Sequence, residues 1–226
     1  MFQHEGPERT AQQNRILAAY LACIGGFVNS VGFVLVGNFT SHVTGNVGRL
    51  ASALAHGVPA GAILAMIIAF FGGAIVSTLI IEGASGVHRA RGYGAALSLE
   101  GALLVLVGAL ASHDLLATLG LSAAMGMQNS MVTRLSGAVV RTTHLTGVVT
   151  DLGIEVARWM RWGLARERDG TAPSGTRLVL LGTVAGSFTI GAVAGALAGM
   201  RFQASALQAA AAAIFLGAAS AFRSSF

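Results

Sequence analysis

The chain has 226 residues, of which 54% are apolar and only 10% are charged, and its mean hydropathy is +0.71. A soluble domain carries about 25% charged residues, so the composition excludes a purely soluble protein. It predicts a polar cytoplasmic N-terminus over residues 1–14 and a single membrane domain over residues 15–226. All 14 basic residues are arginines, and the net charge is +5. These arginines lie between apolar stretches, so we expect contacts with lipid headgroups and no nucleic acid partner.

Six apolar stretches are long enough to cross a bilayer core, which requires about 20 helical residues. Their length and their lack of polar alternation favour helices over the strands of a barrel. The predicted spans are Ile16–Val36, Ala60–Ile81, Tyr93–Ala111, Leu115–Thr133, Leu178–Met200 and Phe202–Phe222.

Two further segments, residues 40–57 and 142–163, are helix-like but amphipathic. If neither crosses the membrane and the N-terminus is cytoplasmic, 12 of the 14 arginines lie inside, with Arg201 outside and Arg49 unassigned. If both cross, five arginines fall outside. The positive-inside bias therefore favours six spans. Each segment is nevertheless long enough to span, so an arrangement of eight helices in parallel repeats stays open.

A polar motif occurs twice in the chain. Residues 38–46 read Asn-Phe-Thr-Ser-His-Val-Thr-Gly-Asn, and residues 141–148 read Arg-Thr-Thr-His-Leu-Thr-Gly-Val. Each copy follows an apolar stretch with an Asn-Ser pair, 13 positions before the histidine in the first copy and 15 in the second. The shared order indicates an internal duplication, with repeats over about 15–112 and 113–226.

Three spans per repeat would place the second repeat upside down in the membrane. The sequence thus predicts an all-α integral membrane protein with six transmembrane helices, built as inverted three-helix repeats. The two amphipathic segments would be re-entrant or interfacial half-helices that enter from opposite sides. Polar motifs at such broken helices usually form the substrate site of a transporter.

The motif residues suit recognition better than catalysis. The N–H groups at a helix start carry partial positive charge and attract anions, and a histidine adds a donor whose charge depends on pH. No nucleophile–base pair, phosphate loop or metal-binding cluster is visible, so we expect no enzyme, no cofactor and no metal. The alternative for each motif is a Thr/Ser-rich cap that simply ends a helix.

Two acidic residues are candidates for coupling transport to an ion. Glu100 lies inside the third span, where a carboxylate is costly and often functional. Asp151 follows the second motif, one turn before Glu155. The alternatives are a hydrated carboxylate near the interface for Glu100, and a solvated ion pair with Arg158 for Asp151 and Glu155.

Small residues recur along the fifth span at roughly helical spacing, which lets helices approach closely in lipid. Either this face packs within the monomer or it forms a homodimer seam. The residues are Gly182, Gly186, Gly191, Gly195 and Gly199.

Four motifs in order resemble the YoaK family, also called domain of unknown function 1275. They are Gly-Phe-Val-Asn-Ser at 26–30, Ser-His-Val-Thr-Gly-Asn at 41–46, Gly-Met-Gln-Asn-Ser at 126–130 and the run from Thr142 to Gly153. The resemblance covers nearly the whole chain and implies a bacterial multi-pass inner-membrane protein without an established substrate. Relatives often have Asp where this chain has Asn29, so the resemblance implies no carboxylate for ion coupling at this position.

The function that we expect is a transporter or channel for a small polar, preferably anionic, solute. The alternative is a non-transporting membrane scaffold or sensor subunit. The expected localisation is the bacterial inner membrane, and the expected partners are the lipid bilayer and the solute. The predicted pathway residues are Asn29, His42, Thr44, Gly45, Asn46, Gln128, Asn129, His144, Thr146 and Gly147.

Overall fold

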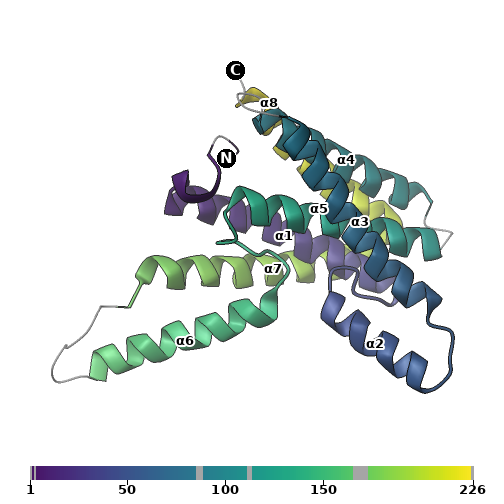
Figure 1. The fold of residues 1–226 in the computed structure, drawn as a ribbon, viewed down its shortest axis with the longest axis horizontal. Helices are drawn as coiled ribbons and strands as arrows, with labels where there is room; N and C mark the ends of the chain where they lie inside the picture. The colour runs from purple at the N-terminus through teal and green to yellow at the C-terminus, as the bar shows by residue number, and fades with distance from the viewer. Residues whose placement is uncertain (1, 3, 85–88, 111–113, 165–172, 225–226) are drawn as a thin grey trace.

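The computed structural model describes residues 2, 4–84, 89–110, 114–164 and 173–224, and over these residues it is helical without strands. Its order of elements is shown in Figure 1. The elements are η1 (Gly6–Glu8), α1 (Ala11–Val36), α2 (Val43–Ala55), α3 (Gly61–Gly83), α4 (Arg89–Ala109), α5 (Asp114–Leu135), α6 (Leu145–Leu164), α7 (Gly175–Phe202), η3 (Gln203–Ala206) and α8 (Leu207–Arg223).

The chain is a membrane protein, because four helical stretches within the described residues are long and apolar enough to cross a bilayer. They are Ala11–Val36, Gly61–Gly83, Arg89–Ala109 and Gly175–Arg223. The last is 49 residues long and contains α7, η3 and α8, and the backbone turns at Gln203, where φ is 49°. The fourth predicted stretch, Leu115–Thr133, lies in α5, which is helical over 22 residues but carries more polar side chains.

Two pairs of long helices form the centre of the bundle, α1 against α7 and α3 against α5. The first crossing is close because a Cβ on Gly26 would overlap the carbonyl oxygen of Phe188, and one on Gly191 would overlap that of Cys23. In the second crossing, a Cβ on Gly126 would overlap the carbonyl oxygen of Phe70, and one on Gly73 that of Ala123. Both crossings therefore depend on reciprocal glycine-to-backbone contacts, as small residues permit in membranes.

The directions of the helices follow from which residues face each other. α1 and α7 are parallel, since Cys23, Phe27 and Val31 face Gly191, Gly195 and Gly199 in the same order. In contrast, α1 and α5 are antiparallel, because Gly25 faces Gln128 and Gly32 faces Leu121.

α4 and α8 are antiparallel as well, because Gly94 faces Phe222 and Gly101 faces Phe215. In contrast, α3 and α5 run in the same direction, away from the end where α2 lies (Figure 1). α4, which connects them in the sequence, runs in the opposite direction.

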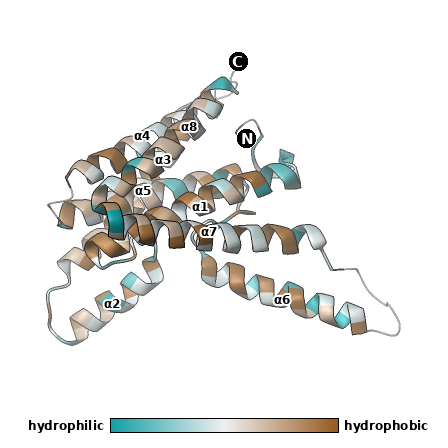
Figure 2. Cartoon of the chain, turned by 180° about the vertical axis from the view of Figure 1, so that it is seen from behind, coloured by the Kyte–Doolittle hydropathy of each residue, from teal (hydrophilic) through white to brown (hydrophobic). Residues whose placement is uncertain are grey.

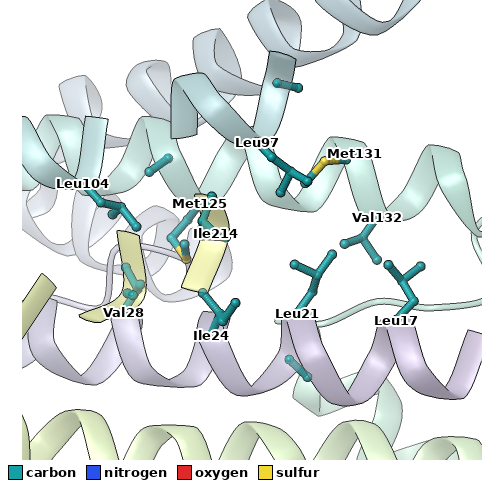
Figure 3. Close-up of a cluster of buried hydrophobic side chains, with 14 of the residues drawn as sticks. Leu17, Leu21, Ile24, Val28, Leu97, Leu104, Met125, Met131, Val132 and Ile214 are labelled. Atoms are coloured by element: carbon teal, nitrogen blue, oxygen red, sulfur yellow. The ribbon is translucent and has the colours of Figure 1, made fainter. Parts of the chain in front are cut away.

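Apolar side chains of α1, α4, α5 and α8 fill the interior, as Figure 3 shows. Leu17, Leu21 and Val28 of α1 are fully buried, as is Leu104 of α4. Large apolar side chains also cover the outer faces of the helices (Figure 2), among them Ile68 and Phe71 of α3 and Leu197 of α7. Such an outer surface is suited to lipid.

α2 and α6 lie on one side of the bundle and stand out from it (Figure 1). α2 has only 13 residues, which gives a length of about 20 Å. α6 has 20 residues and alternates polar and apolar patches along its length (Figure 2). The two helices begin close together, beneath α1 and α7, and diverge toward their C-terminal ends (Figure 1).

The N-terminal segment is packed against the bundle. Phe2 is buried and stacks on Tyr93 of α4 with 6.2 Å between ring centroids. Arg9 is buried and donates to Asn14 Oδ1 at 2.7 Å. Thr10 caps α1 in a reciprocal capping box with Gln13. α1 consequently begins at Ala11, five residues before the predicted start, because the capping box fixes the first turn.

The glycine-rich face of α7 is divided between two environments. Gly191, Gly195 and Gly199 lie against the backbone or side chains of α1, whereas added Cβ atoms at Gly182 and Gly186 would meet nothing within 4 Å. The first three glycines thus serve packing within the monomer. A homodimer through the remaining part of this face stays a prediction.

Candidate functional site

A cavity of about 1280 Å³ lies between α1, α7 and the starts of α2 and α6. It extends along α1 from Ala11 to Asn29, a distance of about 27 Å for 18 helical residues. Both copies of the duplicated motif contribute to its wall. The motif residues that line it are Phe39, Ser41, His42, Val43 and Thr44 in the first copy and Arg141, Thr143, His144, Leu145, Thr146, Gly147 and Val148 in the second.

The first motif forms the N-terminal end of α2. The carbonyl oxygen of His42 accepts the first helical hydrogen bond from the N–H of Asn46 at 3.1 Å, and the His42 side chain makes no capping hydrogen bond. Its imidazole lies over Gly45, where a Cβ would overlap the ring. Phe39 meets the same ring edge-on at 6.5 Å between centroids. Gly45 therefore makes room for the imidazole and does not itself line the cavity.

The second motif forms the N-terminal end of α6 in the same way. The carbonyl oxygen of His144 accepts a hydrogen bond from the N–H of Val148 at 3.2 Å. Burial lowers the pKa of His144, and the positive charge of Arg141 lowers it further. The neutral imidazole is consequently favoured near pH 7. Gly147 differs from Gly45, because the space beside it is open.

Each motif is joined to its preceding long helix by an asparagine and a hydroxyl. The Ser41 Oγ donates to Asn29 Oδ1 at 2.8 Å, and the Ser41 N–H approaches the same oxygen at 3.4 Å. The Thr143 Oγ1 donates to Asn129 Oδ1 at 2.7 Å. Asn129 also donates through Nδ2 to the carbonyl oxygen of Met125 at 2.8 Å. These bonds fix where the two motifs turn into α2 and α6.

Charged side chains gather where α6 approaches the start of α7. Arg177 Nη2 lies 3.1 Å from Asp151 Oδ2, and Arg177 Nε lies 3.5 Å from Glu155 Oε1. Arg158 Nη1 lies 2.9 Å from the same Glu155 oxygen. Asp151 lines the cavity together with its partner Arg177. The sequence pairs both acids with Arg158, but Asp151 instead pairs with Arg177 from the next helix.

The structure separates the predicted pathway residues into three groups. Asn29, His42, Thr44, His144, Thr146 and Gly147 line the large cavity. Asn129 lines a neighbouring cavity of about 360 Å³, whose wall also includes His144 and Phe70. Gly45, Asn46 and Gln128 line neither cavity.

Asn46 and Gln128 have structural contacts instead. Asn46 Nδ2 donates to the carbonyl oxygen of Phe39 at 3.4 Å, which closes the turn before α2. Gln128 Nε2 donates to the carbonyl oxygen of Leu21 at 2.6 Å and joins α5 to α1. The Gln128 side chain is fully buried, and its Oε1 has no hydrogen-bond partner among the described residues.

Glu100 of α4 lies outside both cavities, in the interior of the bundle. It is fully buried, and neither carboxyl oxygen has a hydrogen-bond partner within the described part of the chain. The burial fits the prediction of a carboxylate inside the third span, and a role in coupling stays a prediction.

Several cavity residues have no signal in the sequence motifs. Phe70 of α3 and Phe188 of α7 line the cavity, but they stand in uniformly apolar stretches. Arg177 follows the Ser174 cap of α7, so its position near a helix start could have been predicted, whereas its contact with α6 could not. Ser41 and Thr143 belong to the duplicated motif. The hydroxyl group that both copies have at this position is the feature of the sequence from which the bonds to the two asparagines could have been predicted.

The comparisons with known proteins identify a family but no function. A family model described as "Protein of unknown function (DUF1275)" matches residues 17–220, which confirms the resemblance to domain 1275; the name YoaK is not itself tested by this match. Comparisons with curated proteins and with solved structures found no match.

Proposed function

We propose that this chain, which belongs to the DUF1275 family, is a transporter or channel for a small polar solute, with a preference for anions. The observation that supports this most directly is the convergence of the starts of α2 and α6 on one cavity, each with its His and Thr in the wall. The free N–H groups of two helix starts give the cavity a positive potential. Arg141 and Arg177 add positive charge, and the carboxylate of Asp151 offsets only that of Arg177.

The proposal includes six transmembrane helices, α1, α3, α4, α5, α7 and α8. α2 is too short, at about 20 Å, to cross a core of about 30 Å. α6 carries Asp151, Glu155, Arg158 and Arg161, which would be costly in lipid. With the N-terminus in the cytoplasm, α2 would enter from the outer side and α6 from the inner side.

We further propose that residues 15–112 and 113–226 are inverted repeats. The support is that the α1–α7 and α5–α3 crossings correspond: Gly26 and Cys23 in the first match Gly126 and Ala123, and Phe188 and Gly191 match Phe70 and Gly73. The antiparallel course of α1 and α5 gives the two repeats opposite directions. The bonds from Ser41 to Asn29 and from Thr143 to Asn129 correspond as well.

In this orientation the described cavity is accessible from the cytoplasmic side. Its wall includes Ala11 and Ser174, at the cytoplasmic starts of α1 and α7, and reaches His42 further across the membrane. The localisation that accompanies the proposal is the bacterial inner membrane. The arginine distribution supports the orientation, because it follows the positive-inside rule.

Labelling of single cysteines tests the topology. With Cys23 replaced by Ser, cysteines at Ala84 and Ser174 should react only from the cytoplasmic side, and cysteines at His56 and Leu110 only from the outside. Eight spans would reverse the result at His56, Ala84 and Leu110, while Ser174 would stay inside. The inverted repeats would then have to be abandoned.

Flux into proteoliposomes tests the transport activity. Urea and nitrate are suitable probes, since both are planar with four heavy atoms and differ by one charge. Purified protein in liposomes, with valinomycin and potassium to balance nitrate, should accelerate volume recovery in stopped-flow light scattering. Rates equal to those of protein-free liposomes for both probes would favour the scaffold or sensor function.

A further inference from the structure

We infer that Asn29 sets the charge preference of the cavity by donating its side-chain amide to an anionic group of the solute. This inference rests on the proposed transport function and identifies the solute class as small oxyanions. The residue that would exert this control lies on α1, where it lines the cavity. Only 8% of the surface of Asn29 is exposed, so the orientation of its side chain is restricted.

The hydrogen bonds of Asn29 fix which end of the amide faces the cavity. Oδ1 receives both the Ser41 hydroxyl, at 2.8 Å, and the Ser41 N–H, at 3.4 Å. Two donors on one atom identify it as the carbonyl oxygen. Nδ2 is then the remaining polar atom, and it makes no hydrogen bond to any residue in the described ranges. An amide donor held in this way is available to a ligand.

Asn129, the matching residue of the second motif, has no such free donor. Its Nδ2 donates to the carbonyl oxygen of Met125, and it lines the smaller cavity instead of the large one. The two asparagines share the same hydroxyl contact but differ in what the amide nitrogen does. Of these two matched asparagines, Asn29 is therefore the one that presents an amide nitrogen without a described partner to the large cavity.

The groups around the free amide favour a negative ligand. The N-terminal end of α2 lies next to Asn29 through Ser41, and its first N–H groups lack helical partners. Thr44 and His42 line the wall at the same end. The titratable and charged groups elsewhere in the wall are His144, Arg141 and the Arg177–Asp151 pair. Among the described residues of the wall, Asp151 is the one acidic side chain, and it is paired with Arg177.

Replacing Asn29 by Asp tests this assignment with minimal change in shape. Asp retains the oxygen that accepts both Ser41 bonds, but it exchanges the amide donor for a negative charge. At pH 8, the ratio of nitrate to urea flux should fall by roughly tenfold or more, because like charges repel in a partly buried site. Urea flux should persist, since urea can donate to a carboxylate.

Asn38→Asp is the matched control. Asn38 lies in the connection between α1 and α2 that also contains Ser41, and its Oδ1 accepts a hydrogen bond from Arg49. It lies outside the cavity wall. The same chemical change there should leave the flux ratio at the parent value. Asn29→Leu is the second variant, in case the Asp variant does not reconstitute. Leu has a similar volume but no hydrogen-bond donor, so it should lower nitrate flux more than urea flux.

The outcomes separate this inference from the proposed function. A flux ratio within twofold of the parent in both Asn29 variants would overturn it. If the parent protein moves neither probe, transport fails, and thermal stability of the purified protein decides the inference. Stabilisation of the parent by nitrate that is lost in Asn29→Asp would support an anion site without transport. Equal stabilisation in both proteins, or none in either, would reject the anion site at Asn29.

Discussion

Gly26 and Gly126 occupy corresponding places in two helix crossings, each with its Cα against the carbonyl of a phenylalanine from another helix. Gly26 of α1 faces Phe188 of α7, and Gly126 of α5 faces Phe70 of α3. Both phenylalanines also line the large cavity. The glycines thus determine how closely two cavity-lining helices approach the centre of the bundle.

Alanine at either glycine should destabilise the protein by about 1–3 kcal/mol, because the added methyl group would overlap backbone that cannot move aside. Thermal unfolding of the purified protein in detergent measures the effect. Gly182→Ala is the matched control on a transmembrane helix, since the space beside Gly182 is open. Equal melting temperatures for Gly26→Ala and Gly182→Ala would show that the close α1–α7 crossing is absent in the membrane protein.

His42→Ala and His144→Ala should each weaken nitrate binding, by about 1–3 kcal/mol if a buried polar partner is left unpaired. Since both side chains line one cavity, the effects should be non-additive in the double variant. Calorimetric titration of the four proteins with nitrate measures the cycle. Additive losses would mean that the two histidines act at separate sites, and parent-like binding in both single variants would make them helix-cap residues.

The lowered pKa of His144 predicts a loss of stability on acidification. The unfolded chain takes up a proton near pH 6.5, the ordinary value for histidine, whereas the folded protein does so only at lower pH. The unfolded state therefore binds more protons in that window, and the free energy of unfolding falls as the pH drops below about 6.5. His144→Gln should lose less stability between pH 7.5 and pH 5 than the parent does.

The control for this comparison is His56→Gln, which removes an imidazole outside the cavity wall. It should leave the pH dependence of nitrate binding at that of the parent, because the cavity wall is unchanged. The same protonation of His144 would add positive charge to the cavity, so nitrate should bind more tightly as the pH falls below 6.5. A pH dependence that is identical in the parent and His144→Gln would contradict both expectations.

Removing Glu100 should stabilise the fold, because both of its carboxyl oxygens are buried and have no hydrogen-bond partner among the described residues. Glu100→Met fills a similar volume and should raise the free energy of unfolding by about 1–3 kcal/mol. Glu155→Met is the contrasting variant: Glu155 is equally buried but contacts Arg158 and Arg177, so its loss should destabilise. A large destabilisation in Glu100→Met would show that the carboxyl group has a partner in the membrane.

The role of Glu100 in coupling stays a separate prediction. If a proton on Glu100 drives transport, Glu100→Gln should retain nitrate binding but lose accumulation that depends on a pH gradient. Measuring uptake with and without an imposed gradient separates the two effects. Unchanged gradient-driven uptake in Glu100→Gln would assign Glu100 no part in coupling.

The sequence was most informative where polar residues interrupt apolar ones. The duplicated motif predicted that His42 and His144 would stand at helix starts, and the structure places both there and in one wall. Three of the six apolar stretches lie entirely within one helix, namely Ile16–Val36 in α1, Leu115–Thr133 in α5 and Leu178–Met200 in α7. Ala60–Ile81 begins one residue before α3, Tyr93–Ala111 extends past the end of α4 at Ala109, and Phe202–Phe222 runs from the end of α7 through η3 into α8. Composition alone could make these predictions because hydrophobic length and capping residues act locally.

Contacts between residues far apart in the sequence could not be predicted from the sequence pattern. Nothing near Gln128 indicates that its amide bonds the Leu21 carbonyl, and Phe2 gave no sign that it would stack on Tyr93. Asn129 stands in the same Asn-Ser pair before the motif as Asn29 does, yet it lines a different cavity. Such differences depend on which helix packs alongside, and a single sequence does not state that.

The crossings also bear on how the chain assembles during synthesis. α1 finds its closest partner in α7, and α3 finds its own in α5, so each half of the chain completes the other. The first half therefore leaves the ribosome with its glycine faces exposed to lipid and cannot reach its final packing until α5 and α7 have been inserted. A truncated chain that ends after α4 would lack both central crossings. We expect it to stay incompletely packed and to be degraded by quality-control proteases.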